Sequence, residues 1–306
     1  MKTVVTGGAG FIGSHIVDAL AAKGNGVAIV DNLSTGKEEN INSEVRFFHV
    51  DVTDFEALEE VFAETKPEVV FHAAAQIDVR KSVEEPYFDA EVNVIGSVNL
   101  FTLCVRYGVK RVVLSSTGGA LYGEPSRIPA DENTPVEPLS AYGVAKFAVE
   151  QYLNYFKRLY GLETVVLRYG NVYGPRQDPF GEAGVIAIFM HRMLNNKQPI
   201  VYGDGTQTRD YIFVEDVVRA NLLSINGKEG TYNIGTGIET SVNQLLELFS
   251  RITGNALKAE YVPARKGEVS RIALDCEKAK KELGFVSKVL LEEGLRRTVE
   301  WYRMTK

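Results

Sequence analysis

The sequence predicts an α/β protein, a doubly wound parallel sheet covered by helices and followed by a smaller α/β lobe. Short apolar runs alternate with amphipathic helical patterns through the first two-thirds of the 306 residues, which is typical of strand–helix–strand units. Glycine or polar residues follow most of these runs, at the strand ends where such sheets bind ligands. After about residue 170 glycine and proline cluster, and the elements become shorter.

The alternation places each element of the first part. We expect strands at residues 2–6, 26–30, 45–50, 68–72, 111–116 and 163–168. We expect helices at residues 14–23, 54–63, 86–107 and 141–160. Gly108 and Gly161 follow the last two helices, where a left-handed residue ends many helices. One edge of the sheet should therefore collect Gly7, Asp31, Asp51, Ala73 and Ser115.

The C-terminal part has a different pattern. Helices are predicted at residues 185–195, 214–225, 242–253, 277–283 and 291–303, with short strands between them. Ser241 and Gln244 have the spacing of a capping box. We expect residues 1–170 to form the first domain, joined by strands and a helix that return from about 205–235. Residues 171–306 should mainly form the second, substrate-binding lobe.

A glycine-rich turn joins the first strand to the first helix. Gly8, Gly10 and Gly13 satisfy the spacing G-x-G-x-x-G, and Gly7 gives the wider alternative. These glycines permit a tight turn and close approach of a pyrophosphate to the helix N-terminus, as in a Rossmann domain. Asp31 ends the second strand, where a carboxylate binds adenosine ribose hydroxyls and repels a 2′-phosphate, so we expect NAD rather than NADP. A turn residue without that role is the alternative.

Tyr142 and Lys146 form the candidate proton-transfer pair. Positions i and i+4 of a helix lie on one face, so the ammonium should favour the phenolate and lower the tyrosine pKa from about 10 toward neutrality. Such a tyrosine can act as a general acid or base at physiological pH. An exposed helical pair without chemistry is the alternative interpretation.

Composition excludes several classes of protein. The net charge of −6 and the absence of a basic tract argue against nucleic acid. We identify no apolar run of the ~20 residues that span a bilayer and no room for a signal peptide before the first strand, so we expect a cytoplasmic enzyme. Cys104 and Cys276 should be reduced packing residues, and we expect His72 to be a core residue and no metal site.

Eight motifs together resemble the extended short-chain dehydrogenase/reductase family, in its UDP-glucose 4-epimerase branch. The resemblance runs from Thr3 to about Trp301. The motifs are TGGAGFIG at 6–13, DNL at 31–33, HAAA at 72–75, NVIG at 93–96, SST at 115–117, YGVAK at 142–146, LRYGNVYGP at 167–175 and RDYI at 209–212.

The resemblance assigns catalytic roles to three residues. Tyr142 would be the acid/base, and Lys146 would hold the phenolate and the nicotinamide ribose. Thr117 would bind the reacting sugar oxygen, a role for which Ser116 is a rival, because the Gly118-Gly119 pair loosens the alignment here.

The resemblance also implies a cofactor site. Asp51 and Val52 would flank the adenine of NAD, and Asn93 would brace the catalytic strand ends. The expected cofactor-binding residues are Gly7, Gly10, Phe11, Ile12, Gly13, Asp31, Asn32, Ser34, Thr35, Gly36, Asp51, Val52, Ala73, Ala74, Ala75, Asn93, Ser115, Tyr142, Lys146 and Tyr169.

A UDP-sugar is the substrate that the resemblance implies. Arginines suit its diphosphate, because a guanidinium makes bidentate charge-assisted contacts; a surface charge pair is the alternative for Arg209 and Arg265. The expected substrate-binding residues are Ser116, Thr117, Tyr142, Asn171, Val185, Tyr202, Arg209, Arg265 and Glu268.

The expected reaction is reversible epimerisation at C4, from UDP-galactose to UDP-glucose, through a transient 4-keto sugar. The alternatives are a 4-epimerase of UDP-glucuronate, whose carboxylate could meet Arg80, or of a UDP-N-acetylhexosamine. Dehydratases on this fold carry an Asp-Glu pair where Gly118-Gly119 stands, which disfavours dehydration. A non-catalytic NAD-sensing regulator would not need the tyrosine and lysine. The helices at 86–107 and 141–160 resemble a homodimer interface of this family.

Overall fold

The computed structural model describes residues 1–180, 184–255, 258–264 and 269–305. Its central sheet has seven parallel strands in the order β11-β6-β5-β4-β1-β2-β3. These strands are β1 (Lys2–Thr6), β2 (Gly26–Asp31), β3 (Arg46–His49), β4 (Val69–His72), β5 (Arg111–Thr117), β6 (Glu163–Tyr169) and β11 (Gly230–Ile234). The predicted fold class is confirmed, and the six strands predicted in the first part begin and end within one residue of their expected positions.

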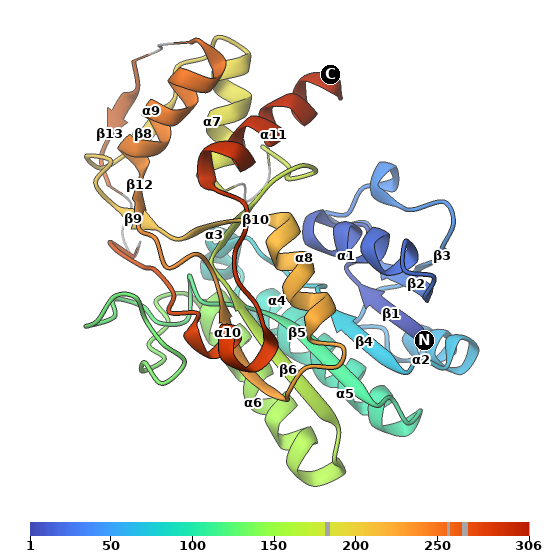
Figure 1. The fold of residues 1–306 in the computed structure, drawn as a ribbon. Helices are drawn as coiled ribbons and strands as arrows, with labels where there is room; N and C mark the ends of the chain where they lie inside the picture. The colour runs from blue at the N-terminus through green and yellow to red at the C-terminus, as the bar shows by residue number, and fades with distance from the viewer. Residues whose placement is uncertain (181–183, 256–257, 265–268, 306) are drawn as a thin grey trace.

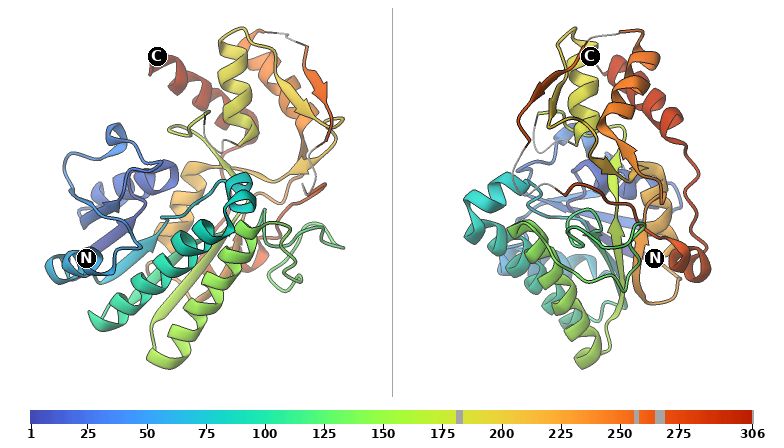
Figure 2. Two further views of the ribbon diagram at one scale, coloured as in Figure 1. Left: turned by 180° about the vertical axis from the view of Figure 1, so that it is seen from behind. Right: turned by 90° about the vertical axis from the view of Figure 1, so that its left-hand side faces the viewer.

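Helices cover both faces of the sheet, as Figures 1 and 2 show. One face carries α1 (Phe11–Ala21) and α8 (Val214–Leu223), which pack against each other although they lie far apart in the sequence. The other face carries α2 (Phe55–Thr65), α5 (Gly96–Arg106) and α6 (Ala141–Tyr160). An apolar core fills each side of the sheet, so the strands are buried on both faces, as parallel strands usually are.

Helix α6, which carries the proposed proton-transfer pair, has ends that the local sequence determines. The Oγ of Ser140 accepts a hydrogen bond of 3.1 Å from the Gly143 N–H, a typical N-cap contact. Gly161 ends the helix with a φ of 71°, which glycine adopts without steric cost. Val149 and Leu153, four residues apart on the inner face, are fully buried against the sheet.

The predicted helix at 86–107 is divided in the structure. It consists of α4 (Pro86–Ala90), the π-helical turn η2 (Glu91–Ile95) and α5. A π turn inserts an extra residue into the helix and is frequent at functional sites. A further helix, α3 (Val79–Glu84), precedes it and was not predicted; the Asp78 carboxylate caps its N-terminus.

By length and composition alone, the run Pro86–Arg106 could cross a membrane, contrary to our expectation that no such run exists. Its position in the fold explains the composition. Leu100, Phe101 and Cys104 are fully buried in the core between the sheet and its helices. The buried face of the run therefore belongs to the core, where Cys104 packs as a free thiol.

The C-terminal lobe lies at one end of the sheet (Figure 1). Its helices α7 (Val185–Leu194), α9 (Val242–Thr253) and α11 (Leu291–Met304) enclose a third apolar core. Its short strands pair as β7 (Asn171–Tyr173) with β10 (Tyr211–Phe213), β9 (Thr208–Arg209) with β12 (Thr240–Ser241), and β8 (Ile200–Tyr202) with β13 (Glu260–Val262). The remaining elements are the 3-10 turn η1 (Glu38–Asn40) and α10 (Glu277–Leu283).

The predicted capping box of Ser241 and Gln244 is present and begins α9.

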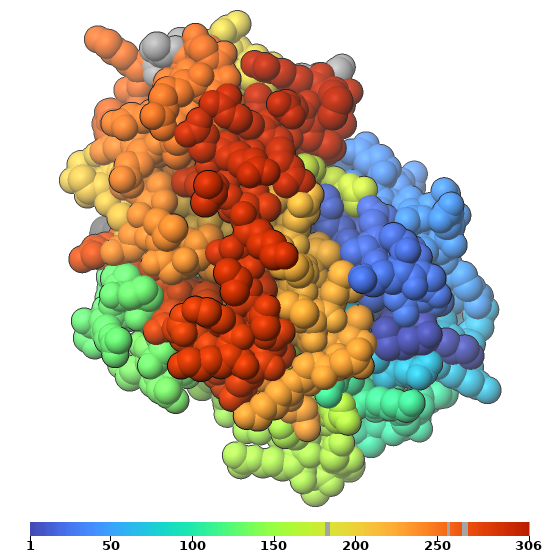
Figure 3. Space-filling view, in the orientation of Figure 1, coloured from blue at the N-terminus to red at the C-terminus, as the bar shows by residue number. Residues whose placement is uncertain are grey.

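The C-terminal part is joined to the main sheet. Strand β11 joins the main sheet beside β6, and Figure 3 shows the C-terminal segment on the same face of the molecule as α8 and the N-terminal residues. The division into residues 1–170 and 171–306 stays a prediction.

His72 is a core residue at the end of β4. Its imidazole bonds to Thr6 Oγ1 at 2.7 Å and to Ser97 Oγ at 2.9 Å. Burial, and secondarily the charge of Lys146, lowers the pKa of His72 from 6.5 to about 3. The neutral ring is therefore part of the folded structure.

We predict that acid destabilises the protein through His72. Between pH about 6.5 and about 3 the unfolded chain binds a proton at this residue and the folded protein does not, so stability falls as pH falls through this window. His72→Gln should reduce the slope of the free energy of unfolding against pH by up to about 1.4 kcal/mol per pH unit, measured by urea denaturation. The exposed His49, changed to Gln, is the control; equal slopes in wild type and His72→Gln would contradict the prediction.

Candidate active site

Lys146 is buried beneath the carboxyl end of β5. Its Nζ donates a hydrogen bond of 2.7 Å to the backbone carbonyl of Ser115, and the residue is 5% exposed. Tyr142 lies one turn earlier on α6, and its backbone N–H donates to Ser82 Oγ at 3.1 Å. The pair is therefore held between β5 and α3, which excludes the interpretation of an exposed helical pair.

The pKa of Tyr142 differs from the sequence-based expectation. Burial, and secondarily the charge of Asp89, raises it well above its usual value of 10. Burial also lowers the pKa of Lys146 to about 8, although Glu150 and Asp89 oppose this change. The expectation considered only the neighbouring ammonium, and desolvation outweighs that effect because both groups lie inside the protein.

Tyr142 and Thr117 open into a cavity of about 480 Å³ between the sheet and the C-terminal lobe. Its described lining includes six of the nine expected substrate-binding residues: Thr117, Tyr142, Asn171, Val185, Tyr202 and Arg209. Arg265 and Glu268 lie outside the described residues. The cavity thus joins elements from both parts of the chain.

Ser116 does not fit the role of a rival to Thr117. Its Oγ donates to Glu150 Oε1 at 2.5 Å and is buried, and the residue is not part of the cavity lining. Adjacent residues of a strand point to opposite faces, so Thr117 reaches the cavity and Ser116 faces α6. The structure thus does not bring Ser116 into the cavity, and its role in substrate binding stays a prediction.

The cavity contains polar groups that have no partner among the described residues. Asn171 Oδ1 and Tyr211 Oη are buried and make no hydrogen bond there. Arg209 donates to the Thr208 carbonyl at 2.8 Å and forms no ion pair within the described part of the chain. Buried polar groups in native proteins usually have partners, so Asn171 Oδ1 and Tyr211 Oη are available to a polar ligand, and the Arg209 guanidinium is available to an anionic group.

Several residues that line the cavity were not predicted from the sequence. Tyr211 stands within the RDYI motif, but only its neighbour Arg209 was assigned to the site. Arg192 on α7 adds a second guanidinium. The other lining residues that were not predicted are Val79, Gly119, Ala120, Leu139, Ser140, Gly170, Ile188, Phe189, Ile200, Val201, Gln207, Val242 and Val269. Gly170 stands within the LRYGNVYGP motif and Gly119 within the glycine pair after Thr117; no motif marks the others.

The glycine turn has the geometry of a phosphate site. A Cβ at Gly7 would lie 2.6 Å from the Ala74 nitrogen, and one at Gly13 would lie 2.0 Å from the Gly7 oxygen. Gly7 also has a φ of 69°, which L side chains rarely adopt. The Gly10 N-cap has no side-chain hydrogen bond, so the first turn of α1, at Phe11 and Ile12, can bind an anion.

Carboxylates at the ends of β2 and β3 lie at the same edge of the sheet as the glycine turn. Asp31 Oδ2 accepts from the Ala9 N–H at 2.9 Å and Oδ1 from the Leu33 N–H at 2.8 Å, which fixes it beside the glycine turn. Asn32 Nδ2 donates to Asp51 Oδ2 at 2.6 Å and joins the ends of β2 and β3. This edge fits a dinucleotide, since a carboxylate follows the glycine turn at the ribose position.

The other expected cofactor residues surround the same edge. Ser34 and Thr35 are exposed in the turn after β2, and Gly36 approaches Asp31. Val52 packs against Gly96. Ala73, Ala74 and Ala75 follow β4, and the Asn93 amide bonds to the Gln76 backbone. Ser115 and Tyr169 bond to each other at 3.1 Å, and Asn221 Nδ2 also donates to the tyrosine.

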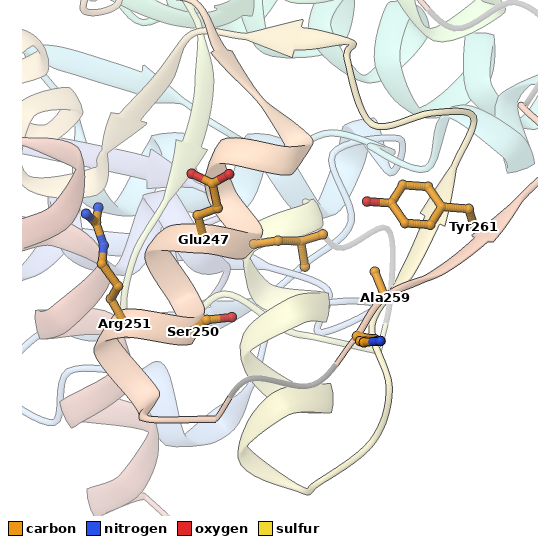
Figure 4. Close-up of a pocket in the computed structure, with 7 residues that line it drawn as sticks. Glu247, Ser250, Arg251, Ala259 and Tyr261 are labelled. Carbon is orange, nitrogen blue, oxygen red and sulfur yellow. The ribbon is translucent and has the colours of Figure 1, made fainter.

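A second hollow, of about 660 Å³, lies elsewhere in the C-terminal lobe. Figure 4 shows Glu247, Ser250 and Arg251 on one helix, and Ala259 and Tyr261 on a neighbouring segment. None of its lining residues belongs to the predicted site, and it is more open than the first cavity. We assign the candidate active site to the cavity at Tyr142.

A buried ionic network supports the catalytic helix from behind. Glu150 on α6 pairs with Arg168 on β6 at 2.6 Å, and their side chains are 4% and 6% exposed. Arg168 also donates to Tyr122 Oη at 2.9 Å, which donates to Asn233 Oδ1 at 2.8 Å. The network joins α6 to strands β5, β6 and β11.

Comparisons with known proteins agree with this site. Residues 3–235 match the model of the NAD dependent epimerase/dehydratase family. The chain is 45% identical over 311 residues to a UDP-glucose 4-epimerase of Mycolicibacterium smegmatis, covering 99% of both chains. Two solved structures are similar over almost their whole length. UDP-glucose 4-epimerase of Thermotoga maritima with UDP-glucose is 52% identical, with a TM-score of 0.98 and coverage of 100% and 99%. UDP-glucose 4-epimerase of Thermus thermophilus in complex with NAD is 46% identical, with a TM-score of 0.96 and 99% coverage of both.

We predict that the protein depends strongly on Glu150. Glu150→Gln leaves the Arg168 guanidinium buried without its carboxylate, which should lower the free energy of unfolding by about 3–5 kcal/mol. Urea denaturation measures this change. Glu277→Gln, which breaks the exposed pair with Lys280, is the control and should change the value by less than about 1 kcal/mol. Similar values for both variants would show that the network contributes little.

Proposed function

The chain belongs to the NAD dependent epimerase/dehydratase family, and we propose that it is a UDP-glucose 4-epimerase that interconverts UDP-galactose and UDP-glucose. One observation carries the proposal. One cavity is lined by the hydroxyls of Tyr142 and Thr117, by Asn171 and Tyr211, whose buried oxygens have no hydrogen-bond partner among the described residues, and by Arg209. The two hydroxyls suit the reacting sugar, and the Arg209 guanidinium suits a nucleotide diphosphate.

Specific residues of this chain would perform the reaction. The glycine turn, Asp31 and Asp51 would hold NAD, which when bound would accept the hydride of C4, return it to the opposite face of the 4-keto sugar, and supply a positive ring that favours the phenolate. Tyr142 Oη takes the proton of the 4-hydroxyl and returns it after the 4-keto sugar has turned. The Lys146 ammonium, one turn along α6 from Tyr142, supplies positive charge that favours the phenolate. Thr117 Oγ1 holds the sugar oxygen in line with Tyr142.

The nucleotide half of the substrate would bind on the lobe side. Arg209 has no carboxylate partner in the described structure, so its charge is available for a diphosphate. Asn171 and Tyr202 also line the cavity. Arg265 and Glu268 stay predictions as further contacts.

Two alternatives are less well supported. A dehydratase would need an aspartate at Gly118, whose Cβ would lie 2.7 Å from the Leu274 methyl groups, so that leucine side chain would have to move. Arg80, considered for a uronic acid, has a side chain 58% exposed that pairs with Asp78 at 3.7 Å, and it is not part of the cavity lining. Both observations favour epimerisation of a neutral hexose.

Incubation with individual UDP-sugars tests this function. We expect conversion of UDP-galactose to be faster than conversion of UDP-glucuronate or UDP-N-acetylglucosamine, measured by product chromatography.

Tyr142→Phe should lower kcat by at least about 100-fold, because general acid–base catalysis contributes this much. The variant should still bind NAD. Wild-type turnover in Tyr142→Phe would refute the assignment, and preference for UDP-glucuronate would replace the substrate.

We also propose a homodimer formed by the helices 86–107 and α6. On α6, Tyr152, Tyr155 and Leu159 are 44%, 49% and 58% exposed and lie on one face. Tyr87 and Ile95 on the neighbouring helical run are 80% and 53% exposed. Apolar groups gathered this way are typical of an interface.

The free cysteines support action in a reducing compartment, which we propose is the cytoplasm.

Light scattering at micromolar concentration should give the mass of a dimer. Leu159→Glu should shift it toward the monomer, because a carboxylate would be buried without a partner. Met304→Glu, at an exposed position of the other lobe, is the control and should leave the dimer intact. A monomeric wild type would contradict the proposal.

A further inference from the structure

Asp89 is a buried carboxylate that neither the sequence motifs nor the reaction uses. The residue lies on α4 and is 1% exposed. Its Oδ1 accepts hydrogen bonds from Gln76 Nε2 at 2.9 Å and from Asn93 Nδ2 at 3.0 Å. Its Oδ2 is buried and has no hydrogen-bond partner among the described residues. Burial of such an oxygen costs free energy, so its presence requires an explanation.

The surroundings of Asp89 contain the catalytic pair. Helix α4 packs against α6, and the charge of Asp89 acts on both Lys146 and Tyr142. Lys81 on α3 is the other nearby cation, but its ammonium lies over the Phe88 ring, 4.1 Å from the centroid. Burial raises the pKa of Asp89, and the hydrogen bonds from Gln76 and Asn93, together with the charge of Lys146, oppose this rise and favour the carboxylate.

Lys146 needs a buried anion to remain charged. Its ammonium donates to the neutral carbonyl of Ser115, and burial favours the uncharged amine. Two carboxylates oppose this effect. Glu150 is paired with Arg168, which compensates its charge. Asp89 forms no ion pair in the described part of the chain, so Lys146 is the cation whose charge acts on it.

We propose that Asp89 is a positioning residue of the catalytic pair, a buried anion that keeps the Lys146 ammonium charged beneath Tyr142. Through Gln76 and Asn93 it also fixes the segment that follows β4, where the cofactor would bind. The π turn that contains Asn93 directs the amide toward Asp89, four residues earlier. The inference rests on the proposed function for its kinetic test, but its electrostatic test is independent of turnover.

Asp89→Asn separates charge from structure. The amide oxygen can accept the same two hydrogen bonds as Oδ1, so the fold should be retained. We expect the pKa of Lys146, about 8 in the wild type, to fall by about one unit. NMR titration of the enzyme labelled with carbon-13 lysine measures it, with and without NAD, and Lys146→Met identifies the signal. Glu85→Gln, an exposed charge four residues earlier, is the matched control and should leave the pKa unchanged.

The pH profile of kcat/KM for UDP-galactose gives the second readout. Loss of the anion should lower the pKa of Tyr142 and the pKa of Lys146. The rising and the falling side of the pH profile should therefore both move to lower pH by about one unit. A purely structural role would lower activity at every pH and leave both sides in place. Asp89→Ala, a second neutral variant, should move them in the same direction.

The outcomes distinguish this inference from the proposed function. An unchanged Lys146 pKa in folded Asp89→Asn or Asp89→Ala overturns the role of Asp89, whatever the turnover. A wild type that converts none of the UDP-sugars refutes the function and leaves the NMR titration as the test of the electrostatic role. A shifted pKa together with a shifted pH profile supports both.

Discussion

The hydrogen bond from Lys146 to the carbonyl of Ser115 is the contact on which the site depends. It brings an ammonium under the end of β5 and thereby fixes α6, with Tyr142, against the strand that carries Thr117. Burial of this cation is costly, and the surrounding structure offsets the cost with negative charge. Glu150 lies one turn along the same helix, and Asp89 approaches from α4.

The same burial determines how the proposed catalyst would work. In the protein alone, the Tyr142 phenol is strongly disfavoured as an anion, because water is excluded and Asp89 lies nearby. A tyrosine in this state would keep its proton until the positive ring of bound NAD favoured the phenolate. Proton transfer would then depend on formation of the complete site, in keeping with the position of the cavity between the sheet and the lobe.

Sequence patterns were sufficient for most of the fold. Apolar runs predicted six of the seven strands of the main sheet, and the helix bearing Tyr142 begins and ends as expected because Ser140 and Gly161 are local signals. The division of the helix at 86–107 was missed, since a π turn has no distinct composition. The helix α3 was also missed, because it is short and is defined by the Asp78 cap.

The sequence by itself determined the chemistry of the local motifs: the glycine turn, the strand-end carboxylate and the tyrosine–lysine spacing. These are properties of neighbouring residues, whose backbone geometry follows from their own side chains. Only the tertiary structure decided that Thr117 rather than Ser116 faces the cavity, that Tyr211 and Arg192 join it, and that the pKa of Tyr142 rises. Those results depend on which distant segments exclude water and bring their charges close, and desolvation and Coulomb energy are set by such packing rather than by order along the chain.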